Sequence, residues 1–496
     1  MRNCVPASWR TIPFDLAFKN VTSSKLKLPR GSYSVTGIYP VIDQGEDYIG
    51  GYTDDETLVH PTPPPVVVFG DHTRAVKYVD RQFVQGADGV KVLAPSSAMS
   101  PRFAYWSLSH ADITSRGYAR HYSLVRKLEF LLPPLPEQHR IVEAVESYLT
   151  RLDDAVASLE RVQRNLERYR ASVLKAAVEG RLVPIEAALA RKEGRSYEPA
   201  SVLLERILVE RKIRWIEDAA EKARAKAEAR SLKAGKPWTP EDDALALAKA
   251  RKTAETKYKE PEAPDTADLP TLPEGWCWTS IGEAFEVLVG ATPSRRESTY
   301  WNGVIPWVSS GEIMFNRIRA TRETITEAGL ANTSTQVSPP GTVLIGMIGE
   351  GKTRGQVAIQ EIAACNNQNS AAIRVSETPC ISEYVYFYLE SQYEQTRRRG
   401  SGGNQPALSK ARVSVIPLPL PPAAEQRSIA LALEEKLSVE QAITTQLVYA
   451  QKKSVRFRQS ILKWAFEGKL VEQNPDDEPA SALLERIRAE RSEARR

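Results

Sequence analysis

Residues 132–144 read LPPLPEQHRIVEA, and residues 420–432 read LPPAAEQRSIALA. The two stretches stay aligned at a constant offset of 288 residues, without a gap, until they end as RASVLKAAVEGRLV at 170–183 and RQSILKWAFEGKLV at 458–471. Of the 52 aligned positions, 21 are identical. This period is far longer than the roughly 20–50 residues of a solenoid repeat. The chain is therefore a duplication of one large unit, and we expect a pseudo-two-fold internal repeat.

Each repeat opens with prolines and then continues without proline in a pattern typical of a coiled coil. In the first copy, apolar residues recur in alternating steps of four and three, which predicts one long helix that ends at Gly180. The second copy is polar at Lys436, Glu440 and Ser454, so its seam is weaker or shifted towards Leu437. A narrow apolar stripe needs a partner helix, and we predict that the two copies pack against each other. The predicted seam of the first copy is Ile141, Val145, Tyr148, Leu152, Ala155, Leu159, Val162, Leu166, Tyr169, Val173 and Ala176.

The composition indicates several folded domains. A chain of 496 residues is too long for a single core, because domains usually hold about 100–200 residues. The sequence contains no apolar run near the roughly 18–20 residues of a membrane span, and its start lacks the pattern of a secretory signal. Its 4 cysteines lie far apart without a CxxC pair, which fits a reducing cytoplasm. A net charge of +5 permits a nucleic-acid partner without requiring one.

A globular module precedes each repeat, and the two modules are only faintly alike. Pro6 and Trp9 echo Pro273 and Trp276, and GIYPVIDQGE at 37–46 echoes GVIPWVSSGE at 303–312. Both modules contain short β-like runs between turn signals, and one helix with apolar periodicity. We therefore predict an α+β fold, with two globular α/β modules of mostly antiparallel strands and two long coiled-coil helices. The predicted boundaries are 1–131 for the first module, 132–183 for the first spacer helix, 184–270 for a charged helical segment and proline-rich linker, 271–419 for the second module, 420–471 for the second spacer helix and 472–496 for a helical tail.

One motif points towards nucleotide binding. Residues 346–353, GMIGEGKT, match the P-loop pattern GxxxxGK[ST]. A P-loop requires a helix directly after it, whereas the sequence that follows, RGQVAI, favours a second strand. We therefore expect a glycine-rich β-hairpin tip that exposes Lys352 and Arg354. The sequence contains no histidine pattern with metal-ligand spacing, nuclease carboxylate cluster or AdoMet-type glycine loop, which argues against catalysis by the chain.

Polar loops in matching places of the two modules favour DNA binding. Arg and Lys side chains suit phosphates and guanine edges, while Asn and Gln suit adenine edges. For any one residue a solvated loop side chain is the simpler interpretation, so the prediction rests on the set. The candidate DNA-binding residues are Asp71, His72, Arg74, Arg116, Arg120, His121, Tyr122, Arg295, Arg296, Lys352, Arg354, Asn366, Asn367, Gln368, Asn369, Arg397, Asn404, Gln405 and Lys410.

The repeated segments resemble the specificity (S) subunit of type I restriction-modification enzymes. The resemblance rests on LPPLPEQ and LPPAAEQ, each followed by a long helix that ends in KAAVEGRLV or KWAFEGKLV. It also rests on LPEGWCWTSIGE at 272–283, which is similar to the start of that family's second recognition domain. The segment SGGNQPALSKARVSVIPLPLPP at 401–422 is similar to the usual end of that domain.

The resemblance implies that the two modules are target recognition domains, each reading one half of a split target in double-stranded DNA. It also implies that the two long coiled-coil helices pack antiparallel and separate the modules as a spacer. It implies that two methyltransferase subunits and two restriction or motor subunits dock on the chain. The complex is then expected to methylate adenine at N6 with AdoMet, or to translocate and cut DNA with ATP and Mg. These cofactors belong to the partner subunits. The chain itself is expected to be non-catalytic and cytoplasmic, without a cofactor, a metal or a membrane partner.

Two other functions stay open on the sequence alone. One is a P-loop nucleotide-binding enzyme that uses Lys352 and Thr353. The other is a coiled-coil adaptor with two protein-binding modules and no DNA binding. A steep salt dependence of duplex binding distinguishes a nucleic-acid binder from an adaptor.

Overall fold

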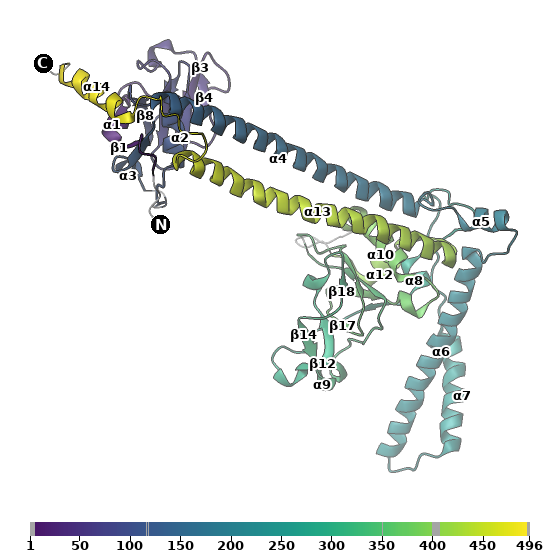
Figure 1. The fold of residues 1–496 in the computed structure, drawn as a ribbon. Helices are drawn as coiled ribbons and strands as arrows, with labels where there is room; N and C mark the ends of the chain where they lie inside the picture. Colours follow the sequence, from purple (N-terminus) through teal and green to yellow (C-terminus); the bar gives the residue numbers. More distant parts are fainter. Residues whose placement is uncertain (1–4, 116, 118, 350, 399–406, 494–496) are drawn as a thin grey trace. The chain divides into compact units, whose positions relative to one another are not determined.

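The computed structural model describes residues 5–115, 117, 119–349, 351–398 and 407–493, with side chains up to residue 489. The chain divides into two compact units, one of residues 1–163 with 445–496 and the other of residues 164–444. Each unit holds one globular module and a part of each long helix, α4 (Leu135–Val178) and α13 (Ala423–Phe466) (Figure 1).

The module of the first unit is built on two small sheets. The larger has strand order β2-β8-β5-β6 and is antiparallel throughout, and the smaller has order β4-β3-β7 with β3 and β7 parallel. All five residues of β5 are buried because alternate side chains face different cores. Val67 and Phe69 pack in the cluster that contains Phe103 of α2, whereas Val68 packs with Ile42 of β3. The elements are β1 (Arg10–Pro13), α1 (Phe14–Ala17), β2 (Phe18–Asn20), β3 (Tyr39–Ile42), β4 (Gly51–Thr53), β5 (Val66–Gly70), β6 (Val76–Val79), β7 (Val84–Gln85), β8 (Val90–Pro95), α2 (Pro101–His110), α3 (Tyr122–Val125) and β9 (Glu129–Leu132).

The module of the second unit repeats this architecture. Its larger sheet has order β11-β18-β15-β16-β13 and its smaller sheet has order β14-β12-β17. Val343 and Ile345 of the central strand β15 face one core, and Leu344 faces another that includes Val308 of β12. The elements are β10 (Cys277–Ser280), α8 (Ile281–Ala284), β11 (Val287–Val289), β12 (Trp301–Val308), β13 (Asn316–Ile318), β14 (Glu323–Ile325), α9 (Glu327–Ala331), β15 (Thr342–Gly346), β16 (Val357–Gln360), β17 (Cys365–Asn366), β18 (Ser370–Ile373), α10 (Ser382–Ser391), α11 (Tyr393–Arg398), α12 (Lys410–Ser414) and β19 (Pro417–Leu420).

The duplication therefore extends into the modules, although their sequences are only faintly alike. Strand for strand, β2-β8-β5-β6 matches β11-β18-β15-β16, and β4-β3-β7 matches β14-β12-β17. The second module adds the edge strand β13, which pairs parallel to β16. The prediction of two α+β modules with mostly antiparallel strands is confirmed.

Both long helices begin directly after the two adjacent prolines that open each repeat, and both end just before a glycine. Each has 44 residues, which corresponds to about 66 Å at 1.5 Å per residue. Gly180 and Gly468 follow them with φ of 67° and 68°, the left-handed conformation that terminates a helix. The predicted stop at Gly180 is confirmed. The remaining helices are α5 (Glu186–Glu193), α6 (Ala200–Lys233), α7 (Pro240–Lys257) and α14 (Ala480–Glu493).

The buried seam of α4 differs from the predicted seam at every second position. Tyr148, Val162 and Tyr169 are predicted seam residues, but their side chains are 47%, 40% and 43% exposed. Ala155 is exposed as well, so the prediction is wrong at these four positions. In α13 the side chains of Ile443, Phe457 and Trp464 are exposed, and Leu437 is buried as the shifted register requires. The seam residues of α4 are Val145, Leu149, Leu152, Val156, Leu159, Gln163, Leu166, Arg170, Val173 and Ala177.

Polar pairs explain why this register is adopted. In the first unit, Gln451 donates from Nε2 to Oε1 of Gln163 at 3.3 Å, and Arg458 is paired with Asp153. Asp153 precedes Gln163 along α4, whereas its partner Arg458 follows Gln451 along α13. The two helices are therefore antiparallel there. In the second unit, Arg170 binds Glu440 of α13 at 2.9 Å and also Glu390 of α10. The predicted and the observed register share every second apolar position of α4. In the observed register, the polar seam residues Gln163 and Arg170 also have partners on α13.

A tryptophan–glutamate hydrogen bond fixes the start of each long helix to its module. Trp9 donates from Nε1 to Oε2 of Glu137 at 3.0 Å, and Trp276 donates from Nε1 to Oε1 of Glu425 at 3.0 Å. Glu137 also accepts from Gln473, and Glu425 accepts from the backbone N–H of Glu186 at 2.9 Å. Both carboxyl groups are about 1% exposed, and burial raises the pKa of each. The echo of Trp9 in Trp276 thus marks two equivalent helix junctions.

Replacement of Glu425 by Ala is expected to lower the free energy of unfolding by about 2–4 kcal/mol. The substitution leaves the Trp276 indole N–H and the Glu186 amide N–H without an acceptor in a buried site, and each unpaired group costs about 1–3 kcal/mol. The matched control is Glu435→Ala, which removes an exposed carboxylate from the same helix. Thermal unfolding of the two variants checks the prediction, and equal midpoints would contradict it.

Candidate nucleic-acid interface

Three loops meet at one end of the larger sheet in each module. In the first module, the N–H of Asp71 donates to Gly89 at 2.6 Å, and the Asp71 carbonyl accepts from the His121 N–H at 2.8 Å. Each bond joins the β5–β6 hairpin to a different loop. We call the segments 71–75, 86–89 and 120–122 the tip loops of the first module.

The second module repeats this junction at equivalent positions. The N–H of Met347 donates to Asn369 at 2.8 Å, and the Met347 carbonyl accepts from the Leu408 N–H at 2.9 Å. Asp71 and Met347 each follow the last residue of the central strand, β5 or β15. The tip loops of the second module are 347–356, 367–369 and 407–410. The same backbone frame therefore carries different side chains in the two modules.

In the first module, the predicted residues divide into a buried frame and an exposed rim. Asp71 is 2% exposed and accepts the Tyr122 N–H at 2.7 Å, and His121 is 0% exposed with Nδ1 3.0 Å from the Asp71 carbonyl. Burial raises the pKa of the Tyr122 phenol, and Lys91 lies 5.3 Å from the centre of its ring. Asp71 and His121 therefore hold the tip loops together.

Of the predicted residues of this module, Arg74 and Arg120 are exposed and His72 is half-buried. Arg74 has φ of 64° at the hairpin turn and donates to the Ile113 carbonyl at 3.0 Å. Arg116 lies outside the described residues.

In the second module, two of the predicted adenine readers belong to the frame. Asn366 and Asn367 are 3% and 7% exposed. Asn366 donates to the Ser370 carbonyl at 2.9 Å, and Asn367 Oδ1 accepts the Asn369 N–H at 3.1 Å. Asn369 is half-buried, whereas Gln368 at the apex of the turn is exposed and accepts from Thr292. Among these four, Gln368 is the one whose side chain is exposed.

Arg295 is held in a fixed position by aromatic rings and a carboxylate. Its guanidinium lies 3.7 Å from the Trp301 ring centre and 5.4 Å from that of Trp307, and it pairs with Glu323 at 2.9 Å. The ion pair lowers the pKa of Glu323. Arg296 beside it is exposed. This arrangement orients Arg295 but also neutralises its charge.

The P-loop-like motif is the hairpin that the sequence predicts. β15 and β16 pair antiparallel from Thr342 with Gln360 to Ile345 with Val357, so a strand and not a helix follows the motif. Lys352 is exposed, as expected, and its carbonyl accepts from the Tyr393 hydroxyl at 2.6 Å. Arg354 is only 9% exposed, so the expectation of an exposed Arg354 is wrong.

Arg354 is covered because α11 packs on the hairpin tip. Arg397 of α11 is half-buried and donates to the Arg354 carbonyl at 3.4 Å and to the Tyr393 hydroxyl at 3.2 Å. Lys410 is exposed at the first turn of α12. Asn404 and Gln405 lie outside the described residues.

Two residues beside the tip loops were not among the sequence candidates. Gln44 accepts the His72 N–H at 3.3 Å, and its carbonyl accepts from the Thr73 hydroxyl at 2.5 Å. Ser310 accepts from Asn367 Nδ2 at 3.5 Å. Gln44 and Ser310 occupy equivalent positions in the two similar stretches 37–46 and 303–312. The similarity of these stretches could therefore have indicated both residues.

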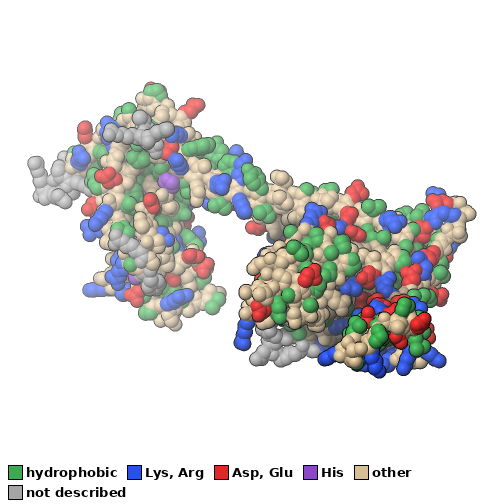
Figure 2. All heavy atoms as spheres, turned by 90° about the horizontal axis from the view of Figure 1, so that it is seen from below, with side chains coloured by type: hydrophobic (Ala, Val, Ile, Leu, Met, Phe, Trp, Pro, Cys, Tyr) green, Lys and Arg blue, Asp and Glu red, His purple; other side chains and the backbone are tan. Residues whose placement is uncertain are grey.

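The surface charge is mixed. In Figure 2, Lys and Arg side chains are interspersed with Asp and Glu over the visible face. Within the described ranges, no group of three or more His, Cys, Asp or Glu side chains is arranged to hold a metal ion. Among the same described residues, no helix is both long and apolar enough to cross a membrane.

Comparisons with known proteins connect this architecture to one family. Residues 273–448 match the family model of the type I restriction modification DNA specificity domain. The MjaIX specificity subunit of Methanocaldococcus jannaschii, a type I restriction enzyme component, is 28% identical over 184 residues, which are 36% of this chain and 40% of the relative. The EcoDI specificity subunit of Escherichia coli is 22% identical over 507 aligned positions, which cover 98% of this chain and 96% of the relative.

The fold also has a solved counterpart. A chain from a structure that concerns assembly and conformational transition of the type I R-M system superimposes with a TM-score of 0.57. The alignment covers 94% of this chain and 99% of that chain, at 17% sequence identity. At this identity the likeness concerns the fold.

Proposed function

We propose that this chain, which belongs to the specificity subunits of type I restriction-modification systems, binds one bipartite DNA sequence through the tip loops of its two modules. The subunit is non-catalytic. The observation that carries the proposal is the repeated junction of tip loops, at Asp71 in one module and Met347 in the other. One backbone frame with two different sets of exposed side chains is what reading two unlike half-sites requires.

The exposed cations supply the electrostatic part of binding. Arg74 and Arg120 in one module, and Arg296, Lys352 and Lys410 in the other, are suited to phosphate oxygens. Gln368 is suited to a base edge, since its amide can both donate and accept. Affinity that rests on such contacts falls steeply with salt.

The chemistry belongs to the partner subunits of the complex. We propose that two methyltransferase subunits use AdoMet to methylate adenine at N6, and that two restriction or motor subunits use ATP and Mg to translocate and cut DNA. The complex acts in the cytoplasm, where the host DNA is. In this proposal the specificity subunit selects the DNA sequence, and the partner subunits catalyse the reactions.

Mapping methylated adenines in the DNA of cells that express the chain with its methyltransferase partner tests the proposal. The expected result is one bipartite motif, with one methylated adenine in each half. Methylation without a split motif, or a purified complex that does not bind duplex DNA, would favour the adaptor interpretation instead.

A second apolar stripe runs beside the seam of the long helices and is the proposed dock for the methyltransferase subunits. In the second unit, Tyr169 of α4 and Val439 and Ile443 of α13 line an open cavity between the two helices. In the first unit, Phe457 of α13 stands at the position that Tyr169 has in the other repeat, and it is 49% exposed. Large apolar side chains left in solvent beside a helix pair are suited to an additional amphipathic helix.

Tyr169→Asp and Phe457→Asp are each expected to remove one of two bound methyltransferase subunits, and the double variant both. A buried carboxylate in a helix–helix contact costs several kcal/mol, while these half-exposed positions tolerate it in the free chain. Leu431→Asp and Val455→Asp are the matched controls, since both residues are exposed elsewhere on α13. Native mass spectrometry of the purified complex reports the stoichiometry. Two bound subunits in the double variant would contradict this dock.

A further inference from the structure

The helical hairpin of α6 and α7 is firmly fixed at its base to the second module. Leu203 and Ile207 of α6 are buried in the main core of the second unit. Arg211 donates to the Glu283 carbonyl at 2.7 Å, and Arg214 donates to the Glu377 carboxylate at 3.0 Å. The remainder of the hairpin extends beyond these contacts (Figure 1).

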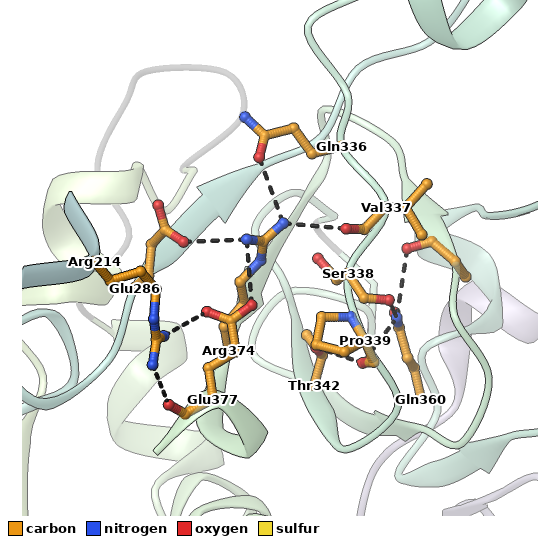
Figure 3. Close-up of polar contacts among 11 residues, drawn as sticks. Arg214, Glu286, Gln336, Val337, Ser338, Pro339, Thr342, Gln360, Arg374 and Glu377 are labelled. Atoms are coloured by element: carbon orange, nitrogen blue, oxygen red, sulfur yellow. Dashed lines mark hydrogen bonds and ion pairs between the residues drawn. The ribbon is translucent and has the colours of Figure 1, made fainter. Parts of the chain in front are cut away.

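A cluster of ion pairs makes this base specific. Arg374 of the module, 14% exposed, pairs with Glu286 at 3.3 Å and with Glu377 at 3.4 Å. Figure 3 shows Glu377 between Arg374 and Arg214, so that one carboxylate joins the module to the hairpin. The direction in which the hairpin leaves the module is therefore set by paired charges and a buried apolar contact.

Two ion pairs join the two helices of the hairpin. Arg224 binds Glu221 at 2.6 Å and Asp243 of α7 at 2.6 Å, and Arg251 of α7 binds Glu217 at 2.7 Å. These contacts neutralise Arg224 and Arg251, and Ala220 of α6 and Ala254 of α7 are buried.

The outer face of α6 carries four cations for which the described residues provide no ion pair. Lys222, Lys226, Arg230 and Lys233 are all exposed and lie at i, i+4, i+8 and i+11, on one side of the helix. They cover about 16 Å of helix. Figure 2 looks onto the end of the hairpin at lower right, where Lys and Arg side chains stand along its edge. We call these four residues the basic face.

Stability of the hairpin does not account for this face. Like charges four residues apart on a helix repel each other and destabilise it. Between 222 and 236 the only acidic residue is Glu228, which is bound to Arg224. A solvated helix face usually mixes both signs, as the rest of this hairpin does. A row of one sign is instead complementary to a polyanion.

We propose that the basic face binds the phosphate backbone of duplex DNA that flanks the bipartite target, without reading its sequence. The proposal rests on the proposed function, because the basic face meets the flanking duplex only while the two modules hold their target. It adds a third, sequence-independent contact to the two specific ones. Four lysine and arginine side chains in a row are suited to phosphates and carry no base preference.

The test uses the complex of the full chain with its methyltransferase partner. Its binding to a duplex limited to the target is compared with binding to the same target extended by about 30 base pairs on each side. The variant is Lys222→Gln, Lys226→Gln, Arg230→Gln and Lys233→Gln together, since glutamine preserves helix propensity. The control removes the same charge from exposed positions elsewhere: Lys249→Gln, Lys252→Gln, Lys257→Gln and Lys259→Gln.

The wild-type complex is expected to bind the long duplex at least about tenfold more tightly than the short one at low salt. The variant should lose this gain, and the slope of log K against log salt on the long duplex should decrease in magnitude by about 3.6, since each of the four phosphate contacts contributes about 0.9. Binding of the short duplex should not change, which also shows that the variant is folded. The control should behave as the wild type.

Three results separate this inference from the proposed function. A wild-type complex that binds no target duplex overturns the proposed function. A wild-type complex that binds its target, with a variant that keeps the full gain on the long duplex, overturns only the basic face. A variant that keeps the gain but loses a copurifying subunit assigns the basic face to protein binding and also overturns the inference.

Discussion

Exchange of residues 14–128 for the corresponding segment of another specificity subunit is expected to change one half of the methylated DNA motif and to leave the other half unchanged. The structure supplies the boundaries for this graft. β1 and β9 pair from Arg10 with Leu132 to Pro13 with Glu129, and therefore hold both ends of the segment together. The Trp9–Glu137 hydrogen bond lies outside the exchanged residues.

The core of the first unit sets one further condition for the graft. The Phe103 ring packs 5.6 Å from that of Phe466 in α13, so Phe103 is retained in the chimera. Binding to the original target should fall by at least about 100-fold, because each mismatched base pair costs about 1–3 kcal/mol. Sequencing of methylated adenines gives the new motif. The reciprocal exchange of residues 281–416, between β10 and β19, should change the other half. A chimera in which both halves change would show that the modules do not read independently.

The long helices could be predicted because their signal is local and repeated. A proline box and a terminal glycine mark both helices without reference to the rest of the chain, and the apolar rhythm between them is unbroken in the first copy. The same applies to the hairpin of β15 and β16, where residues of high strand propensity follow Thr353 in place of a helix.

The seam register could not be predicted from apolar residues, because it depends on polar pairs. Tyr148 and Tyr169 are more apolar than Gln163 and Arg170, so hydrophobicity favours the wrong register. A comparison of the two copies nevertheless indicates the observed register. Gln163 and Arg170 are identical in the second copy, as Gln451 and Arg458, whereas Tyr148 and Tyr169 are replaced there. Identity between copies indicates which positions meet a partner helix.

For the candidate interface, the sequence indicates the loops that carry polar residues, but not which of their side chains are buried. Asx and hydroxyl side chains are common in loops both because they can bind ligands and because they cap turns. Asp71 and Asn367 are of the second kind, since each accepts backbone N–H bonds of its own module. Sequence alone does not separate these roles, because the separation depends on loops that meet only in the fold.

Deletion of residues 160–166 and 448–454 together is expected to shorten the preferred gap between the half-sites by about 3 base pairs and to abolish methylation of the original target. We propose that the helix pair acts as a spacer. The two deleted heptads are equivalent in the repeats, and each contains one member of the Gln163–Gln451 pair. Seven residues correspond to about 10 Å of helix, or about 3 base pairs at 3.4 Å each.

This deletion is designed to leave the rest of the seam intact. Removing a whole heptad preserves the four–three rhythm and rotates the flanking parts of each helix by only about 20°. The Asp153–Arg458 pair and the Arg170–Glu440 pair lie outside both deletions. Gln163→Ala with Gln451→Ala is the matched control, because it removes the polar pair at constant length and should keep the original gap. The gap is read from the methylated motif of each complex. A double deletion that still docks its methyltransferase and methylates the original motif would show that helix length does not set the spacing.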